Sequence, residues 1–407
     1  YYLKMSDVLI IGGGQAGCMV AINLRKQKFK GSITIVTDEA YFPYQRPPLS
    51  KGFLVGTNKA DNLFFKSENY YEKNKISVLT KKPAEKIDTK QQTVTFKDGD
   101  TMSYRKLVLT TGSKLNKINA KEDKKIIYLS SIPQATALKA KLEESKSIGI
   151  IGAGYIGLEV AASAKKMGLT TTVFEAQERI MKRSASNEIA TFLQEYHENM
   201  GVNFKLGTAA KEIKPTERSV NISFTDDTID NPDFVVIGVG VQANNAIAIE
   251  AEIECENGIL VDESCKTSKE NVYAAGDCSS YYFSRYGFRQ RLESVQNAID
   301  QATIVSSSIS GKKAVYSSLP WFWSEQYDLK LQIAGLSQDC DLKVVRGSQD
   351  DHKFSVCHFK NSRLMAVECV NDQKTFMQGK KLIEANSKIT PEAMEDSQTT
   401  LKDWRQG

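Results

Sequence analysis

The stretch DVLIIGGGQAG, residues 7–17, decides the fold. A run with the character of a buried strand leads into Gly12, Gly14 and Gly17, and a helical pattern follows over residues 15–28. Glycines at this spacing permit a tight turn, a close backbone approach to a pyrophosphate and close helix packing. The helix N-terminus adds free N–H groups and a favourable dipole. The stretch therefore predicts a β-loop-α unit that binds a dinucleotide.

Acidic residues end the next predicted strand, SITIVTDE at residues 32–39. An acid at this distance from the glycines binds the ribose of a dinucleotide. We assign that role to Glu39 and interpret Asp38 as a turn residue. Within the glycine loop, Gln15 and Ala16 are predicted to contact the same cofactor.

The pattern recurs in SIGIIGAGYIGLEVAASAKKMGLTTTVFEA, residues 147–176. Its glycines are Gly152, Gly154 and Gly157, again between a strand and a helix. Two dinucleotide units in one chain imply that one holds a bound flavin, FAD, and the other a diffusible nicotinamide.

Glu175 ends the strand that follows the second glycine loop. A carboxylate there accepts hydrogen bonds from a free ribose 2′-hydroxyl and repels a 2′-phosphate. The nearest arginine, Arg179, comes four residues later. The second unit is therefore predicted to prefer NADH over NADPH.

Other predicted strands end in glycine. A hairpin leads into a strand that ends at Thr111 and Gly112, DFVVIGVG ends at Gly240, and NVYAAGDC carries Gly276 and Asp277. Because ligands of such folds bind at the carboxyl ends of strands, all five are predicted cofactor contacts, with Asp277 on the ribityl and phosphate side of a flavin.

Composition sets the outer limits. A chain of 407 residues with 41% hydrophobic content is predicted to form two or three folded domains. A net charge of +5 is too small and scattered for nucleic-acid binding but suits an acidic partner. The three histidines show no metal-ligand spacing except a loose pair of Cys357 and His358, and no apolar run could span a membrane. The N-terminal YYLKM lacks signal-peptide features, so the predicted location is cytoplasmic.

The tail beyond Pro320 changes character. Alternating strands LKLQIAGL, KFSVCHFK and RLMAVECV precede a helical stretch near residues 372–386. The predicted fold is α/β, with two Rossmann-like dinucleotide-binding domains and a small C-terminal α+β domain. We assign residues 1–112 and 245–318 to the FAD domain, 113–244 to the NAD domain and 319–407 to the C-terminal domain.

Several motifs together carry a family resemblance. The sequence resembles the FAD-dependent, NADH-using ferredoxin reductases that supply bacterial oxygenases, members of the glutathione-reductase-like two-dinucleotide fold. The similarity runs from about Asp7 to Trp404, with small departures at Gln45, Thr110 and Ala243. Its motifs are PYQRPPLSK (43–51), LTTGS (109–113), GAGYIGLE (152–159), AAGDC (274–278), RLESVQNA (291–298) and PWFWSEQYD (320–328).

The resemblance implies roles for three charged groups. Arg46 and Lys51, in a proline-stiffened loop, would contact FAD, with Lys51 near the isoalloxazine. Glu159, in the first turn of the second nucleotide helix, would pair with Lys51. Tyr155 and Ile156 of the same helix are further predicted nucleotide contacts.

The resemblance also implies an electrostatic role for a helix that begins near Glu293. Ser294 is its predicted N-cap, and Val295 and Gln296 are the predicted backbone contacts to the flavin. The positive end of the helix would face the pyrimidine edge, where charge accumulates on reduction.

Two of the three tryptophans, Trp321 and Trp323, lie one residue apart in PWFWSEQYD. In a strand they would share one face and leave Phe322 on the other. The resemblance places an aromatic residue of this strand beside the flavin, near the docking site of the iron–sulfur partner. We assign Trp323 to that position, as a catalytic residue together with Lys51 and Glu159, and Trp321 to packing.

The implied partner is an acidic ferredoxin with a [2Fe-2S] cluster, bound by a monomer or weak homodimer. Arg285, Arg289 and Arg291 could form its docking patch, or Arg291 could be bound internally. Rival interpretations are reduction of another one-electron acceptor (rubredoxin, monodehydroascorbate or a nitrite reductase module) and redox signalling like that of apoptosis-inducing-factor relatives. A thiol-dependent enzyme is disfavoured because YFPYQRPPLSKGFL, where such enzymes carry their cysteine, contains no sulfur. The seven cysteines form no C-x-x-C pair and are predicted to be reduced packing thiols.

Overall fold

The computed structural model describes residues 4–121 and 123–405. Residues 1–3 and 406–407, which the predicted outer domains include, lie outside these ranges, and the predicted three-domain division stays a prediction. By their internal contacts the described residues form two compact units. The first unit combines the described part of Tyr1–Gln45 with Asp61–Lys114 and Val241–Pro320, and the second combines Arg46–Ala60, Leu115–Gly240 and the described part of Trp321–Gly407.

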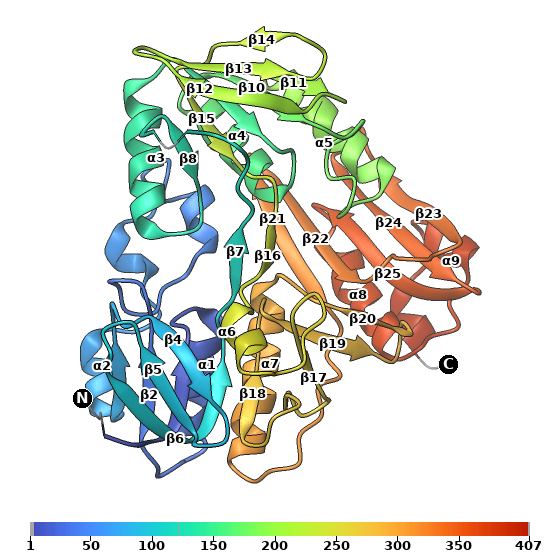
Figure 1. The fold of residues 1–407 in the computed structure, drawn as a ribbon. Coiled ribbons are helices and arrows are strands. Elements are labelled where there is room, and N and C mark those ends of the chain that lie inside the picture. The colour runs from blue at the N-terminus through green and yellow to red at the C-terminus, as the bar shows by residue number, and fades with distance from the viewer. Residues whose placement is uncertain (1–3, 122, 406–407) are drawn as a thin grey trace. The chain divides into compact units, whose positions relative to one another are not determined.

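The first unit contains a seven-stranded sheet of order β3-β2-β1-β6-β5-β4, with β18 added beside β6 (Figure 1). Strands β3, β2, β1, β6 and β18 run parallel, and β5 and β4 continue the sheet in antiparallel pairs. Helix α1 packs against α7. The bounds are β1 Ser6–Ile11, α1 Gln15–Lys26, β2 Ile33–Val36, β3 Ile76–Leu79, β4 Ala84–Asp88, β5 Thr93–Phe96, β6 Thr101–Leu109, β18 Val272–Ala274 and α7 Val295–Ile309.

The predicted elements of this unit form, but three of them end earlier than expected. Helix α1 ends at Lys26 instead of Lys28, which adopts a left-handed φ of 63° that a helix cannot continue through. Strand β2 ends at Val36, so Glu39 lies in the bend beyond it. Strand β6 ends at Leu109, and Gly112 lies in the following loop with a φ of 66°.

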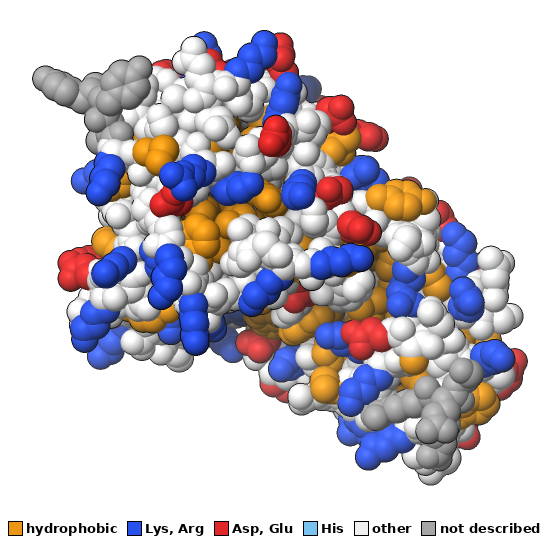
Figure 2. All heavy atoms as spheres, turned by 90° about the horizontal axis from the view of Figure 1, so that it is seen from below, with side chains coloured by type: hydrophobic (Ala, Val, Ile, Leu, Met, Phe, Trp, Pro, Cys, Tyr) orange, Lys and Arg blue, Asp and Glu red, His pale blue; other side chains and the backbone are white. Residues whose placement is uncertain are grey.

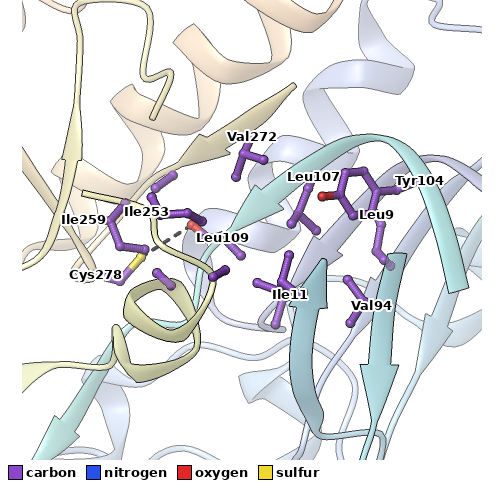
Figure 3. Close-up of a cluster of buried hydrophobic side chains, with 14 of the residues drawn as sticks. Leu9, Ile11, Val94, Tyr104, Leu107, Leu109, Ile253, Ile259, Val272 and Cys278 are labelled. Atoms are coloured by element: carbon purple, nitrogen blue, oxygen red, sulfur yellow. Dashed lines mark hydrogen bonds between the residues drawn. The ribbon is translucent and has the colours of Figure 1, made fainter. Parts of the chain in front are cut away.

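Apolar side chains from parallel strands make the core of this unit. Figure 3 shows Leu9 and Ile11 of β1 beside Leu107 and Leu109 of β6, with Val272 of β18 close by. All of them are buried. The near-continuous apolar runs of these strands follow from burial of a parallel sheet on both faces. This core holds the carboxyl ends of β1, β6 and β18 at one edge.

The second unit contains a parallel five-stranded sheet of order β11-β10-β9-β15-β8. Strand β15 ends at Ile237, before the predicted end at Gly240, and Gly240 has a φ of 89°. An antiparallel sheet β12-β13-β14 packs its apolar side chains into the same core. The bounds are β8 Ile126–Tyr128, β9 Ser147–Ile151, α4 Tyr155–Lys166, β10 Thr170–Glu175, β11 Val202–Leu206, β12 Ala210–Pro215, β13 Val220–Phe224, β14 Ile229–Asp230 and β15 Phe234–Ile237.

The C-terminal part of the second unit is an antiparallel sheet of order β21-β22-β25-β24-β23, partly covered by α8. The predicted strands and helix are present, and β23 is a further strand that the sequence reasoning missed. The bounds are β21 Trp321–Gln326, β22 Leu329–Gly335, β23 Leu342–Ser348, β24 Lys353–Lys360, β25 Arg363–Val370 and α8 Gln373–Glu384.

The remaining elements are short or connect these layers. In the described residues no helix is both long and apolar enough to cross a bilayer. The bounds are η1 Pro47–Ser50, η2 Ala60–Leu63, α2 Glu68–Lys73, β7 Ser113–Leu115, α3 Ile132–Glu144, α5 Asn187–Asn199, β16 Val241–Ala243, α6 Ala246–Glu250, β17 Ile259–Val261, β19 Ser279–Phe283, β20 Phe288–Gln290, α9 Pro391–Glu395 and η3 Leu401–Arg405.

Candidate dinucleotide sites

The first glycine loop joins β1 to α1 and is held against β6. Gly12 has a φ of 116°, and a Cβ there would lie 2.1 Å from the Thr110 carbonyl oxygen. A Cβ at Gly17 would lie 2.1 Å from the Gly12 carbonyl oxygen. Neither position can hold a side chain, because the opposing atoms are backbone and cannot move aside.

Gly14 is different, since a Cβ at this position would meet no atom within 4 Å. Gly14 is also the N-cap of α1 and supplies no side-chain cap for the first N–H groups of the helix. Open space in front of a helix N-terminus is required for a pyrophosphate to bind there. The loop therefore fits the dinucleotide that the sequence predicts. Gln15 and Ala16 begin the helix at this point.

Glu39 lies beyond β2, where its carboxylate accepts a hydrogen bond from the Tyr44 hydroxyl. Its backbone N–H donates to Thr37, which lines the side of the glycine loop beside Gly13. The predicted ribose acid is thus fixed in orientation at the same edge of the sheet as the glycines.

The loop after β6 is hydrogen-bonded to Asn244, near the start of the segment Val241–Pro320 of the first unit. The Thr111 hydroxyl donates to the Asn244 carbonyl oxygen, and the Gly112 carbonyl accepts from the Asn244 N–H at 2.9 Å. These bonds fix two predicted cofactor contacts at the carboxyl end of the sheet.

The Gly-Asp turn after β18 is held by α7. The Gly276 N–H donates to Gln301 of α7 at 2.8 Å, and a Cβ at Gly276 would lie 3.1 Å from that of Ala16. Asp277 accepts from Ser113 at 3.4 Å. The turn, the glycine loop and the loop after β6 therefore meet in one place within the first unit.

The N-terminus of α7 is capped as predicted. Ser294 is the N-cap and accepts from the Asn297 N–H at 3.1 Å. Val295 and Gln296 form the first turn, half-buried, and Gln296 also donates to Asp300. The positive end of a helix is therefore presented by the first unit, the unit that carries the first glycine loop.

The second glycine loop repeats the geometry of the first. Gly152 has a φ of 105°, and a Cβ there would lie 2.2 Å from the Gly238 carbonyl oxygen. A Cβ at Gly157 would lie 2.2 Å from the Gly152 carbonyl oxygen. Gly154, the N-cap of α4, has nothing within 4 Å of its Cβ position and no side-chain cap. This loop fits a second dinucleotide by the same test.

Glu175 is the last residue of β10 and its carboxylate turns back onto the glycine loop. One oxygen accepts from the Ala153 N–H at 2.8 Å and the other from the Gln177 N–H at 2.9 Å. Arg179 donates to the carbonyls of Ile180, Lys182 and Ala185 instead. The acid is fixed beside the loop, and the nearby guanidinium is bound to backbone.

The first turn of α4 presents two further predicted contacts. Tyr155 donates to the Ser184 carbonyl oxygen at 2.8 Å and packs edge-on against Phe322, with 4.7 Å between ring centroids. Burial raises the pKa of Tyr155 well above its usual value, so it stays a neutral phenol. Ile156 is 47% exposed.

Gly240, the predicted cofactor contact after β15, accepts a hydrogen bond from the Asn116 N–H.

The predicted pair of Lys51 and Glu159 is present in the second unit. The ammonium lies 2.8 Å from the carboxylate, with exposed side-chain fractions of 20% and 4%. Glu159 is the fifth residue of α4, so it lies in the second turn and not, as predicted, in the first. Arg46 precedes the 3₁₀ turn η1 and donates to the Ser130 carbonyl oxygen.

Two partners of Glu159 were missed by sequence reasoning. Ser50 donates to one carboxylate oxygen at 2.5 Å, and Ser324 donates to the other at 2.7 Å. Both serines stand in motifs already recognised, RPPLSK and WFWSEQYD, but a lone serine carries no signal of its partner.

The tryptophans lie as strand alternation predicts. Trp321 and Trp323 have ring centroids 5.8 Å apart, and Phe322 turns to Tyr155 of α4. Trp321 also packs on Phe376 of α8 at 5.6 Å. This contact supports the packing role of Trp321, while the flavin-facing role of Trp323 stays a prediction.

All seven cysteines are free, and burial raises the pKa of each thiol. Cys18 in α1 is an example, with a pKa raised to about 11 beside Tyr71. Protonated thiols are poor nucleophiles. The second cysteine near the first dinucleotide site, Cys278, is fully buried and donates to the Leu109 carbonyl oxygen at 3.4 Å (Figure 3).

The arginine cluster before α7 is only partly a surface patch. Arg291 is bound internally, because it donates to the Asp277 carbonyl oxygen at 3.0 Å and pairs with Glu293. Arg289 is exposed but donates to the Ser280 carbonyl oxygen. On the face shown in Figure 2, Lys and Arg side chains are interspersed with Asp, Glu and apolar side chains.

Two glycine loops at helix N-termini, each with a fixed acid at the next strand and with no reactive thiol in the described residues, define a two-dinucleotide oxidoreductase. A comparison with family models agrees. Residues 6–302 match the model of pyridine nucleotide-disulphide oxidoreductases, and residues 321–405 match the reductase C-terminal domain. The chain belongs to the pyridine nucleotide-disulphide oxidoreductase family, and it is an FAD-dependent enzyme that uses NAD(P)H.

Curated relatives and solved structures extend over nearly the whole chain. The chain is 38% identical to a rhodocoxin reductase of Rhodococcus erythropolis over 97% of this chain and 93% of the relative. It is 36% identical to a rubredoxin-NAD(+) reductase of Pseudomonas putida over 89% of this chain and 95% of the relative. Its fold matches the reductase in a solved covalent putidaredoxin reductase–putidaredoxin complex, with a TM-score of 0.95, 31% identity and coverage of 98% of this chain and 97% of that one.

Proposed function

We propose that the chain is an NADH-dependent ferredoxin reductase that supplies electrons to an oxygenase. The observation that carries the proposal is the pair of open glycine loops, with no reactive thiol among the described residues. A bound FAD would supply the capacity to accept a hydride from NADH and to release electrons singly to an iron–sulfur acceptor. The chain's residues have to bind the two nucleotides, orient them and stabilise charge.

The first unit is the proposed FAD site. Its glycine loop, Glu39, the loop after β6 and the Gly-Asp turn all lie at the carboxyl edge of one sheet. Fixing these groups by hydrogen bonds within the unit before the cofactor arrives reduces the ordering cost of binding. The capped N-terminus of α7 supplies positive potential for the charge that develops on flavin reduction.

The second unit is the proposed NADH site. Glu175 is held beside the glycine loop and would accept from the ribose hydroxyls of NADH. The guanidinium of Arg179, which could otherwise neutralise a 2′-phosphate, is bound to three carbonyl groups. Both features support a preference for NADH over NADPH.

Lys51 and Glu159 are the proposed charged pair near the reacting atoms. Glu159 accepts from Ser50, Lys51 and Ser324, so its charge is compensated in a buried place. A buried ion pair survives only with such partners. The carboxylate would hold the Lys51 ammonium in a fixed direction. Trp323 is the proposed aromatic contact on the path to the acceptor.

The acceptor is proposed to be an acidic ferredoxin with a [2Fe-2S] cluster. The net charge of +5 supports an acidic partner, and the exposed Arg285 and Arg289 support docking near α7. Rubredoxin is the second candidate, favoured by the similarity to rubredoxin-NAD(+) reductase. A cytoplasmic location and a monomeric or weakly dimeric state remain predictions.

The test is anaerobic stopped-flow reduction of the FAD-loaded protein by NADH and by NADPH, followed by mixing with a [2Fe-2S] ferredoxin or a rubredoxin. We expect faster flavin reduction by NADH, faster reoxidation by the ferredoxin, and no effect of thiol alkylation. Equal or faster electron transfer to rubredoxin would replace the ferredoxin assignment. Inactivation by alkylation would overturn the mechanism without thiols.

A further inference from the structure

A continuous chain of buried polar side chains leads away from Glu159 within the second unit. Ser324 donates to Glu159 at 2.7 Å, and Gln326 donates to Ser324 at 3.2 Å. The Gln326 carbonyl lies 2.8 Å from Nε2 of His197, and Nδ1 of the same ring lies 3.3 Å from the Tyr327 hydroxyl. This series of hydrogen bonds thus connects the Lys51–Glu159 pair through β21 to α5.

The hydrogen-bond direction along this chain is determined by its chemistry. A carboxylate only accepts, so the Ser324 hydroxyl must donate to Glu159. Gln326 then donates its NH₂ to Ser324 and presents its carbonyl to His197. The ring must therefore carry its proton on Nε2 and accept from Tyr327 on Nδ1. Every dipole in the chain points toward the Glu159 carboxylate.

The hydrogen-bonded side chains are buried, and burial strengthens the hydrogen bonds between them. Ser324, Gln326 and His197 are between 0% and 2% exposed. Burial lowers the pKa of His197 to about 4, so its ring is neutral at physiological pH and can act as donor and acceptor at once. In low dielectric, aligned hydrogen bonds polarise one another, and an unmade one is costly.

We propose that Ser324, Gln326 and His197 form a positioning relay that holds the Glu159 carboxylate oriented toward Lys51. The inference rests on the proposed function for the importance of the Lys51–Glu159 pair. The three are positioning residues, because they act on Lys51 only through Glu159. The relay carries polarisation and not protons, since the Gln326 amide interrupts any proton path.

Strand alternation gives the relay a second consequence. Ser324 and Gln326 occupy one face of β21, and Trp321 and Trp323 occupy the other. Backbone pairing with β22 sets the register of the strand that carries Trp323, and the same strand contacts Glu159 through Ser324. A relay with this geometry couples the position of the charged pair to the position of the aromatic side chain.

Removing the first donor tests the relay. Ser324→Ala should remove one donor from the Glu159 carboxylate, so flavin reduction by NADH should slow about fivefold while the KM for NADH stays unchanged. Gln326→Met should slow the reaction less, because the serine hydroxyl remains. Ser324→Thr, which restores the hydroxyl, should return the wild-type rate.

Ser355→Ala is the matched control. Ser355 is a fully buried serine of the same C-terminal sheet and donates to the carboxylate of Asp372 at 3.0 Å, away from the relay. A general loss of packing would affect both alanine variants alike. A rate of flavin reduction that falls no further in Ser324→Ala than in Ser355→Ala would overturn the proposal. Should Ser324→Thr not fold, Gln326→Met decides by the same comparison.

Histidine ring ¹⁵N NMR of the FAD-loaded protein gives a readout that does not depend on turnover. The chain has only three histidines, and the signal absent from His197→Asn assigns the ring. We expect a neutral Nε2–H tautomer whose Nε2 proton exchanges faster in Gln326→Met. An Nδ1–H tautomer would reverse the chain and refute the relay, whereas lack of flavin reduction by NADH in the wild type would refute only the proposed function.

Discussion

The two glycine loops share a backbone geometry, but the helices that continue from them carry different side chains at a corresponding position. In α1 the second residue after Gly17 is Met19, whereas in α4 the second residue after Gly157 is Glu159. The first helix therefore continues with an apolar side chain, and the second carries a buried carboxylate that pairs with Lys51. The same loop-and-helix scaffold therefore carries an apolar side chain in one unit and a buried carboxylate at the corresponding position of the other.

The acids beyond each loop differ in a related way. Glu39 lies past the end of β2 and is bound by a tyrosine of the next loop, while Glu175 is the last residue of β10 and is bound by the glycine loop itself. In the second site the acid and the glycine loop are therefore joined directly by a hydrogen bond. The Glu39 carboxylate is instead held by a residue outside its glycine loop.

Alanine at the central glycine of each loop should separate the two sites most clearly. Gly14→Ala and Gly154→Ala cause no clash within the protein, since both Cβ positions are open. Each methyl group would instead displace a pyrophosphate, with an expected loss of about 100-fold in affinity. Gly14→Ala should yield folded protein that loses FAD, whereas Gly154→Ala should stay yellow and show a raised KM for NADH.

Flavin absorbance after gel filtration and steady-state kinetics measure these two effects. Thermal unfolding of each FAD-depleted variant is the control for folding. Loss of flavin from Gly154→Ala would mean that the sites have been assigned the wrong way round.

Glu159→Ala should destabilise the second unit by about 2 kcal/mol, because it leaves Lys51 and two buried serines without their acceptor. Met19→Ala, at the corresponding position of α1, should cost about 1 kcal/mol of packing alone. Urea unfolding measures both changes. Flavin reduction by NADH should slow only in Glu159→Ala, and equal slowing in both variants would assign Glu159 to packing.

Glu175→Ala should raise the KM for NADH about tenfold, the effect of losing hydrogen bonds from two ribose hydroxyls to a charged acceptor. Glu175→Arg should in addition reduce the preference for NADH over NADPH. Glu39→Ala is the counterpart and should weaken FAD retention without changing the KM for NADH. Unchanged coenzyme selectivity in Glu175→Arg would exclude the ribose role.

Trp323→Ala should slow reduction of the ferredoxin roughly fivefold while leaving flavin reduction by NADH almost unchanged. Trp321→Ala should lower stability instead, because Trp321 packs on Phe376 and lies under Lys380. Separate half-reactions in a stopped-flow instrument distinguish the two steps. If Trp323→Ala slows both half-reactions equally, the strand has only a packing role.

The glycine loops could be predicted from sequence because their constraint is local. Gly12 and Gly152 need positive φ, and a Cβ at Gly17 or Gly157 would strike backbone of the same loop. The capping of α7 by Ser294 is local in the same sense. Such features depend on neighbours in sequence, so spacing alone reveals them.

The buried polar chain could not be predicted because its members are far apart in sequence. His197, on α5, meets Gln326 on β21 only through packing in the second unit. A lone histidine or glutamine carries no sign of its partner. The internal hydrogen bonds of Arg291 could likewise not be predicted, because the sequence does not show whether the side chain of a loop arginine is bound internally or exposed.

Lowering the pH should destabilise the second unit more than the first, because all three histidines lie in the second unit. The effect is smaller than those expected for the variants above. Burial lowers the pKa of His197 from 6.5 to about 4. Below pH 6.5 the unfolded chain therefore binds more protons than the folded one, and stability falls as the pH falls toward 4. The loss is about 0.7 kcal/mol between pH 7 and pH 6. Hydrogen exchange at these two pH values should show it in α5 and β21 and not in the first unit, and His197→Asn should abolish the difference. Equal loss of protection in α1 and α5 would mean that the acid sensitivity does not come from this histidine.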